Sequence, residues 1–413
     1  MNLVQNINII LRGLTLLGKV FLFLFLAKYL EPNQVGLFGL IMVSIGFSIY
    51  VIGIEFYTYS TRELLKFPAI EWGCYLKSQL FLHIILYFFS FPILITLFIF
   101  KLLPWKFFIA FFLILFLEHI TIELSRLLIA FNNQIKSSIV IFFKSGFWCI
   151  ISLFIIIFFE NFRTIDHILL CCILSLLISL FFGLFFLYKK NIGNWKKKLK
   201  LKWIFRGIKI AIPLLISTLA LRTILTIDRY WIDYLLGSEI LGVYVLFIGF
   251  VASMMSFMDA GVFSFRYPNL IRYHNLKKKI NFKKESDLLK RNTILYSSIS
   301  IIVALIIIKP ILSFINKEIY YENIFIFYSL LVIMIIYILS MVPHYLLYAQ
   351  RYDKVIINSH LIALFIFIFS TFLISMFNPY YSVLFGLILS FSFILIYKTL
   401  IYFRYNQKNT NDS

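Results

Sequence analysis

Long apolar runs alternate with short polar turns along almost the whole chain. A membrane-spanning helix needs roughly 20 apolar residues to cross a hydrocarbon core of about 30 Å, and all but one of the runs come close to that length. We therefore predict an all-α, polytopic membrane protein with about 12 transmembrane helices. The predicted spans are residues 4–27, 35–57, 77–100, 107–130, 139–159, 165–187, 207–227, 240–258, 293–308, 324–348, 355–377 and 380–402. The ninth span is short because its apolar pattern breaks at Lys309-Pro310.

Composition supports this class of protein. Hydrophobic residues make up 62% of the 413 residues and charged residues 14%, whereas soluble domains are about half apolar and about one-quarter charged. The net charge is +21, but the basic residues gather in short segments between apolar runs. That distribution is typical of cytoplasmic loops and of contacts with anionic lipid headgroups. We therefore expect membrane lipids as partners, and no nucleic acid.

The chain offers no pattern for enzymatic or cofactor chemistry. The spacing of its four cysteines, Cys74, Cys149, Cys171 and Cys172, suggests neither a metal site nor a disulfide framework, so we interpret them as packing residues. The longest polar segment, residues 259–292, contains no glycine-rich phosphate loop. We predict no ATPase, no catalytic residues, no metal and no cofactor.

Basic residues also indicate the orientation in the membrane. The loops after the sixth and eighth spans carry the densest groups of lysine and arginine. By the positive-inside rule, these loops and both termini lie in the cytoplasm. The first apolar run lacks a basic segment before it and a small-residue cleavage site after it, so we predict a retained span and not a signal peptide. The polar tail, residues 406–413, is predicted to be disordered.

A weak internal repeat divides the chain in two. A shift of 206 residues places Gly36 on Gly242 and Pro104 on Pro310, each pair in corresponding turns. This predicts two six-helix halves, residues 1–188 and 207–405, joined by a basic cytoplasmic linker, residues 189–206. Two such halves around a central cavity, rocking between inward-open and outward-open states, are a common transporter design.

Charged residues inside the spans are the candidates for function, because a cation at the centre of a spanning helix costs roughly 2.5–3.5 kcal/mol on insertion scales. Arg12 and Lys19 lie seven residues apart, so they share one face of the first span. Lys144 and Arg222 add cations in the fifth and seventh spans. These residues, with Arg126, predict a cavity wall for an anionic ligand. Snorkelling to the interface is the alternative, and it suits Arg12 better than the deeper Lys19.

The fourth span is the most polar, and it contains Glu118, His119, Glu123 and Arg126. His119 and Glu123 lie four residues apart, and Glu123 and Arg126 lie three apart, so local pairs can form. One hypothesis is a relay for proton coupling, since buried Glu and His can titrate near neutral pH. The other is a self-neutralising network that only holds helices together.

The exit of the seventh span leaves a similar choice. Asp228 and Arg229 follow Arg222, and Arg229 lies seven residues after it. The pair Arg222 and Arg229 could repeat the arrangement of Arg12 and Lys19 in the second half. Alternatively, Arg229 and Asp233 form an i,i+4 pair at the membrane interface.

Two turn sequences carry a family resemblance. LAKYLEPNQVGLFGL (residues 26–40) and TIDRYWIDYLLGSEILGVY (residues 226–244) resemble the signature turns of Wzx-type flippases of O-antigen repeat units. These flippases belong to the multidrug/oligosaccharidyl-lipid/polysaccharide exporter superfamily. The resemblance extends over the full length and implies a multi-pass protein of the bacterial inner membrane, active in lipopolysaccharide and surface polysaccharide biosynthesis.

The resemblance also implies the activity. Such a protein translocates an undecaprenyl-pyrophosphate-linked oligosaccharide by alternating access, with a polysaccharide polymerase and a chain-length regulator as candidate partners. The five cations Arg12, Lys19, Arg126, Lys144 and Arg222 would then bind the pyrophosphate, since arginine and lysine both suit phosphate oxygens. Coupling to H⁺ or Na⁺, or removal of product by polymerisation, would supply the driving force.

Other classes of protein fit the pattern less well. A cation-coupled multidrug antiporter of the same superfamily predicts an acid-rich cavity, and a lipid II flippase predicts two further spans. A membrane-embedded polysaccharide polymerase or glycosyltransferase predicts a large extramembrane loop with catalytic residues. A non-enzymatic scaffold has no need of buried cations. We therefore expect a flippase, and a transporter rather than an enzyme.

Overall fold

The computed structural model describes residues 3–190 and 192–411, and it is all-α over these residues, without a strand. Twelve helices of the described chain are long and apolar enough to cross a membrane. Both observations confirm the predicted class and number of spans. The apolar runs become helices because a backbone in lipid must satisfy its own hydrogen bonds within the segment.

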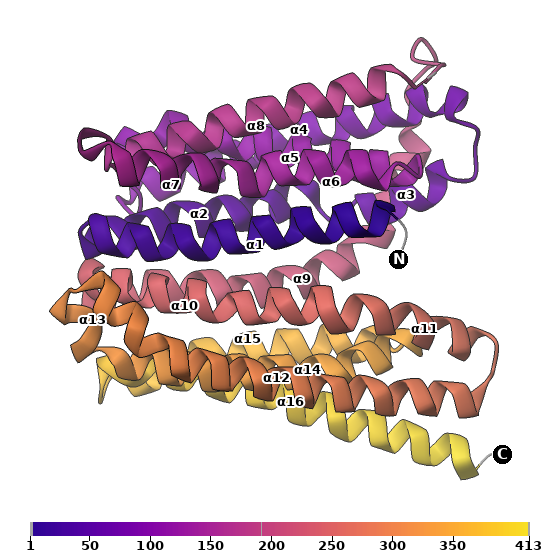
Figure 1. Cartoon of the computed structure of the whole chain (residues 1–413). Coiled ribbons are helices and arrows are strands. Elements are labelled where there is room, and N and C mark those ends of the chain that lie inside the picture. The colour runs from indigo at the N-terminus through magenta and orange to yellow at the C-terminus, as the bar shows by residue number, and fades with distance from the viewer. Residues whose placement is uncertain (1–2, 191, 412–413) are drawn as a thin grey trace. The chain divides into compact units, whose positions relative to one another are not determined.

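The chain divides into two compact units. The first unit contains Met1–Leu30 and Leu37–Leu219. Its helices lie side by side as a bundle in Figure 1, where α1 packs against α6 and α7, and α5 against α8. They are α1 (Leu3–Tyr29), most of α2 (Pro32–Gly53), α3 (Tyr57–Leu64), α4 (Trp72–Ile99), α5 (Phe108–Ala130), α6 (Gln134–Phe142), α7 (Trp148–Phe158), α8 (Ile165–Tyr188) and the first part of α9 (Leu201–Leu236).

The second unit contains Ala220–Ser413 together with the short segment Glu31–Gly36. Within it, α16 packs most extensively against α15 and α14. The boundary between the units falls inside α9, and not in the basic linker where the repeat places it. After α9 come α10 (Ser238–Met258), α11 (Ser264–Asn275), α12 (Lys279–Ile315), α13 (Glu318–Glu322), α14 (Ile324–Ala349), α15 (Asp353–Ser375) and α16 (Pro379–Asn411).

The two glycines that the repeat aligns touch each other within the second unit. A Cβ added to Gly36 would lie 2.8 Å from the carbonyl oxygen of Ser238 and 3.0 Å from the backbone nitrogen of Gly242. A Cβ added to Gly242 would lie 1.9 Å from the carbonyl oxygen of Pro32. The starts of α2 and α10 therefore approach backbone to backbone, which only residues without a side chain allow.

The second helix ends earlier than predicted. The expected span continues to residue 57, but α2 stops at Gly53 because Ile54 and Glu55 adopt positive φ values of 42° and 56°. The short helix α3 follows and buries Tyr59. The period of apolar residues does not reveal this break, since Ile54 and Phe56 continue the apolar run on either side of Glu55.

Other helix ends also differ from prediction. The break expected at Lys309-Pro310 is absent, because α12 accommodates Pro310 in its interior and continues to Ile315. A spanning helix tolerates such a proline where its surroundings satisfy the freed carbonyl. Most of the polar segment 259–292 is helical, in α11 and the start of α12. Helix α16 extends to Asn411, into the predicted disordered tail, and residues 412 and 413 lie outside the described residues.

Candidate functional site

Helix α1 presents its two cations on an exposed face, as the spacing of Arg12 and Lys19 predicts. Lys19 lies ten residues before Tyr29, the end of the span, which is about 15 Å along a helix axis and half of a hydrocarbon core. Among the described residues, no hydrogen bond or ion pair reaches its ammonium group. Its electrostatic neighbours include Lys144 and Glu118.

Lys144 and Glu118 form an ion pair 2.7 Å long, and their side chains are 13% and 21% exposed. Lys144 projects from a π-helical turn, Phe143–Phe147, that interrupts the fifth span. Such turns are frequent at functional sites, because the extra residue changes the direction of the side chains that follow. With Lys19, the pair makes what we call the α1 cation site, where two cations face one carboxylate.

A second network uses the other face of α5. Glu123 accepts a hydrogen bond 2.8 Å long from Gln79 on α4 and forms an ion pair 2.5 Å long with Arg126. The Arg126 guanidinium also lies over the ring of Tyr57, 3.4 Å from its centroid. Burial and the neighbouring Glu55 raise the pKa of Tyr57 to about 12. Its phenol therefore stays neutral, and the charges of Glu123 and Arg126 pair with each other.

His119 is buried beside this network but has other partners. Its Nδ1 lies 3.0 Å from the hydroxyl of Tyr87, and its ring meets His83 edge to face at 4.7 Å. Its Nε2 and the amide oxygen of Gln79 are buried, and neither has a hydrogen-bond partner within the part of the chain that the structure describes. The predicted local pair between His119 and Glu123 is thus replaced by contacts with α4.

These groups border a pocket of about 630 Å³ between α4, α5 and α8. Gln79, His83, His119 and Glu123 supply its polar part, and leucines of the three helices supply most of the rest. The pocket combines a long apolar wall with one polar end, which suits an amphiphilic molecule.

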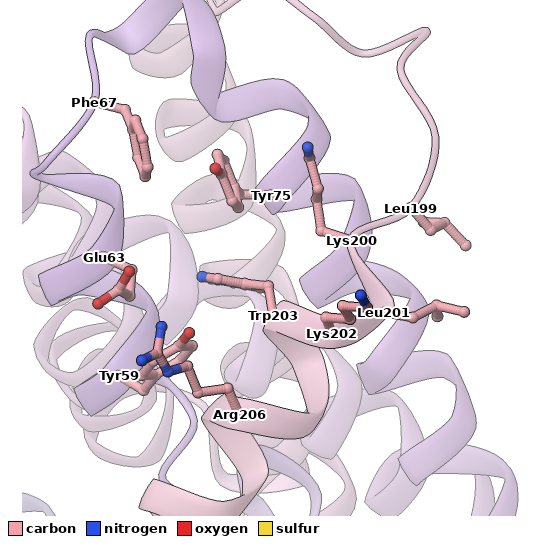
Figure 2. Close-up of a pocket in the computed structure, with 10 residues that line it drawn as sticks. All are labelled: Tyr59, Glu63, Phe67, Tyr75, Leu199, Lys200, Leu201, Lys202, Trp203 and Arg206. Atoms are coloured by element: carbon pink, nitrogen blue, oxygen red, sulfur yellow. The ribbon is translucent and has the colours of Figure 1, made fainter.

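A pocket of about 610 Å³ lies at the start of α9, against α3 and α4 (Figure 2). We call it the aromatic–basic pocket. Trp203 packs edge to face on Tyr75 and at a tilt on Tyr59, with ring centroids 5.3 and 5.4 Å apart. Figure 2 shows that Arg206 extends toward Glu63 and Tyr59. The residues that line the pocket are Tyr59, Glu63, Phe67, Tyr75, Leu199, Lys200, Leu201, Lys202, Trp203 and Arg206.

Two buried polar atoms of this pocket have no hydrogen-bond partner among the described residues. They are the hydroxyl of Tyr59 and the indole nitrogen of Trp203, in side chains that are only 4% and 9% exposed as whole residues. Burial, reinforced by Glu63, raises the pKa of Tyr59, so its phenol keeps its proton and can donate. The sequence gives no sign of this pocket, because its residues come from segments more than 100 positions apart.

In the second unit, the Asp228 side chain is fully buried. It accepts a hydrogen bond 2.6 Å long from Tyr244 and pairs with Arg229 at 3.2 Å. Arg229 also donates to the carbonyl oxygen of Leu225. The alternative pair between Arg229 and Asp233 does not form. Asp228 therefore joins α9 to α10.

Arg222 is exposed on α9 and interacts electrostatically with Asp259. Among the candidates, the structure brings Lys19, Lys144 and Glu118 together and places Glu123 with Arg126 in a separate network. No group of His, Cys, Asp and Glu in the described chain has the arrangement of a metal site. The sequence analysis does not include Lys398 on α16 among the candidate residues, although this buried cation lies well inside the last apolar run.

Comparison with protein-family models gives no match, and neither does comparison with curated proteins. Solved structures do match. A multidrug resistance MATE family transporter of the MOP superfamily in an inward-facing conformation is 10% identical, with a TM-score of 0.73 over 97% of this chain and 96% of the other. A MATE structure in the bent conformation is 11% identical, with a TM-score of 0.58 over 100% and 98% of the two chains.

An outward-facing MATE family transporter of the MOP superfamily is also 11% identical, with a TM-score of 0.56 over 98% of each chain. The structural class is therefore a 12-helix membrane protein with the fold of MATE transporters. At this level of identity, the similarity establishes the fold, and it leaves the cargo to be argued from the residues of this chain.

Proposed function

We propose that this protein is a transporter of the bacterial inner membrane that moves an undecaprenyl-pyrophosphate-linked oligosaccharide between leaflets. The observation that carries the proposal is Lys19, an exposed cation halfway along α1 without a hydrogen bond or ion pair from the described chain. A lysine that faced lipid at this depth would cost roughly 2.5–3.5 kcal/mol. Its retention is explained if α1 faces water and an anionic headgroup.

The charges around Lys19 support an anion. Lys144 and Glu118 neutralise each other, so the α1 cation site keeps one uncompensated positive charge. A pyrophosphate offers several acceptor oxygens, and charge-assisted hydrogen bonds to such groups contribute about 1.5–3 kcal/mol each. Arg12 and Arg222 are also exposed on their helices and add to the cationic character.

The aromatic–basic pocket supports a headgroup that contains sugars. Lys200, Lys202 and Arg206 supply positive charge at one end of the first unit, and Tyr59 and Trp203 supply flat faces and unpartnered polar atoms. Aromatic side chains that carry a hydroxyl or an indole N–H suit ligands that are partly apolar and partly hydrogen-bonding. We propose that this pocket receives the glycan headgroup before translocation.

A cation-coupled multidrug antiporter is the second candidate, favoured by the multidrug resistance protein among the structural matches. A cationic drug needs a free carboxylate in the membrane. The two acids of the fourth span, Glu118 and Glu123, are both held in ion pairs with Lys144 and Arg126. The charge balance of the first unit thus favours an anionic cargo over a cationic one.

The first prediction tests Lys19. Lys19→Ala should lower the transport of the lipid-linked glycan by about 10- to 100-fold, since it removes a cation that contributes about 1.5–3 kcal/mol to anion binding. Lys19→Arg should keep most of the activity. Surface glycan and accumulated lipid-linked precursor are measured in cells, with the amount of membrane protein as a check on folding.

Lys106→Ala is the matched control, because Lys106 forms an exposed ion pair with Asp166 that lies far along the chain from the α1 cation site. The double variant Lys19→Ala and Arg222→Ala should abolish surface glycan. Full surface glycan in the double variant, at normal protein levels, would refute the proposed cargo site. Altered drug resistance in that variant, with unchanged glycan, would establish the antiporter instead.

A further inference from the structure

Three basic side chains from three helices meet inside the second unit. Lys398 on α16 places its ammonium 3.2 Å from Nδ1 of His344 on α14 and 3.0 Å from Nε2 of His360 on α15. The two imidazole rings are parallel, with centroids 6.1 Å apart. Lys398 is 1% exposed and His360 is 6% exposed. We call this arrangement the lysine–histidine cluster.

The hydrogen-bond chemistry of the cluster depends on where the protons are. An ammonium group only donates, so a charged Lys398 requires both facing imidazole nitrogens to accept, with both rings neutral. Proton uptake by either imidazole at its facing nitrogen would place an N–H against an N–H and break that contact. Proton loss from Lys398 would leave an amine that can accept one hydrogen bond. Each change of one proton therefore alters a bond between α16 and another helix.

No carboxylate of the described chain forms an ion pair with Lys398. Among the ion pairs of the described chain, none includes Lys398. The titratable groups beside His344 on the same helix are Tyr345, which meets its ring edge to face, and Tyr348, which stacks on it. Asp259 interacts with Tyr345, while the charged neighbour of His344 is Lys398.

The residues that precede His360 and Lys398 make contacts within their own helices. On α15, Ser359 precedes His360 and bonds to the carbonyl of its own helix. On α16, Tyr397 precedes Lys398 and stacks on Phe393. A buried charge without a counter-ion costs several kcal/mol in a low-dielectric site. A permanently charged Lys398 that only held helices together would therefore destabilise the fold.

We propose that the lysine–histidine cluster is a proton-binding site whose occupancy controls the packing of α14, α15 and α16. With the proton bound, Lys398 ties α16 to both neighbouring helices through two charge-assisted hydrogen bonds. When the proton leaves to water, the cluster is neutral, and the remaining hydrogen bonds are roughly half as strong. The packing of α16, which contacts α15 and α14 most extensively of all helices, then loosens.

This inference does not depend on the cargo. A proton site in the second unit would let a pH difference bias the conformation of a glycan flippase or of an antiporter. It also separates the proton from the α1 cation site and from the acids of α5, where the sequence suggests a relay. The His119 and Glu123 side chains engage Tyr87, Gln79 and Arg126 instead.

The experiment is amide hydrogen exchange of the full-length protein in lipid nanodiscs, measured between about pH 6 and 9. This window overlaps the reference pKa of imidazole, about 6.5, and approaches that of a lysine amine, about 10.4. After correction for the chemical exchange rate, the protection of α15 and α16 should fall by about tenfold or more as pH rises. The helices of the first unit serve as the internal reference.

Lys398→Arg is the decisive variant, because arginine keeps its charge throughout this window. If Lys398 is the proton site, the protection of α16 in this variant should be the same at every pH. If Lys398 is purely structural, the variant should keep the pH profile of the natural protein. His344→Asn with His360→Asn should likewise give a flat profile. Lys309→Met, on the exposed face of α12, is the matched control and should keep the profile of the natural protein.

Two results would overturn the proposal. One is a natural protein whose corrected exchange in α15 and α16 does not change with pH. The other is a Lys398→Arg variant that keeps the pH dependence. Should Lys398→Arg fail to fold, as judged by size-exclusion chromatography, the double histidine variant decides, and a pH dependence retained there refutes the site.

Discussion

The charged residues of the spans show how much a residue's role depends on its neighbours. Glu118 and Glu123 lie on the same helix, yet one pairs with Lys144 on the fifth span and the other with Arg126 on its own helix. Two of the five predicted cavity cations are thereby neutralised. Lys19 keeps its charge uncompensated, and this contrast makes it the strongest candidate for contact with an anion.

At the same scale, Asp228 predicts a stability effect. Asp228→Ala should destabilise the protein by about 3 kcal/mol, because it removes the acceptor of the buried Tyr244 hydroxyl and the ion-pair partner of Arg229. Tyr244→Phe removes the same hydrogen bond but leaves the carboxylate bonded to Arg229, and it should cost about 1 kcal/mol. Thermal unfolding in detergent measures the difference. Equal losses for the two variants would show that Asp228 makes no special contribution.

At the scale of elements, local interruptions of helices place several of the candidate side chains. The π-helical turn Phe143–Phe147 lies where Lys144 meets Glu118. The break after α2 turns the chain so that Tyr57 of α3 lies under Arg126. Both interruptions occur within apolar runs of the sequence. A regular helix through either segment would point these residues in other directions.

The contact between α2 and α10 gives an element-scale prediction. Gly242→Ala should destabilise the second unit by about 1–3 kcal/mol or more, because the added methyl would overlap the carbonyl of Pro32. Gly46→Ala is the matched control, since a Cβ on Gly46 meets nothing within 4 Å and alanine favours the helix by up to about 1 kcal/mol. Protein yield and thermal stability in detergent report the outcome. Equal stability of both variants would contradict the close approach.

At the scale of the whole molecule, the fold matches MATE transporters at 10% identity. The fold is therefore shared by chains in which most individual side chains differ. The same freedom explains why the cargo has to be argued from a few charged residues. The basic loops predict one further whole-molecule property, which is the orientation in the membrane.

Orientation can be tested by cysteine labelling. The positive-inside rule predicts that Lys198→Cys and Lys277→Cys react with an impermeant maleimide only after the membrane is opened. Lys101→Cys and Asn378→Cys should react from outside intact cells. The four native cysteines are free but buried, so background labelling should be low. The reverse pattern would place both termini outside.

The sequence determined the class of protein, the number of spans and two aligned glycines. It could do so because a bilayer imposes a length and a composition on every helix that crosses it. It also singled out Lys19, since an isolated cation in an apolar run is conspicuous without any knowledge of its neighbours. The pair Glu123 and Arg126 was predictable because its spacing lies within one helix.

The tertiary structure decided everything that depends on contacts between segments. It assigned Lys144 to Glu118 across 26 positions and Tyr244 to Asp228 across two helices. It joined His344 and His360 to Lys398, three residues that lie 16 and 38 positions apart along the chain and carry no common motif. Hydrophobic periodicity shows which side of a helix is apolar. The partner of a polar side chain is set by packing between helices, and this packing exists only in the folded chain.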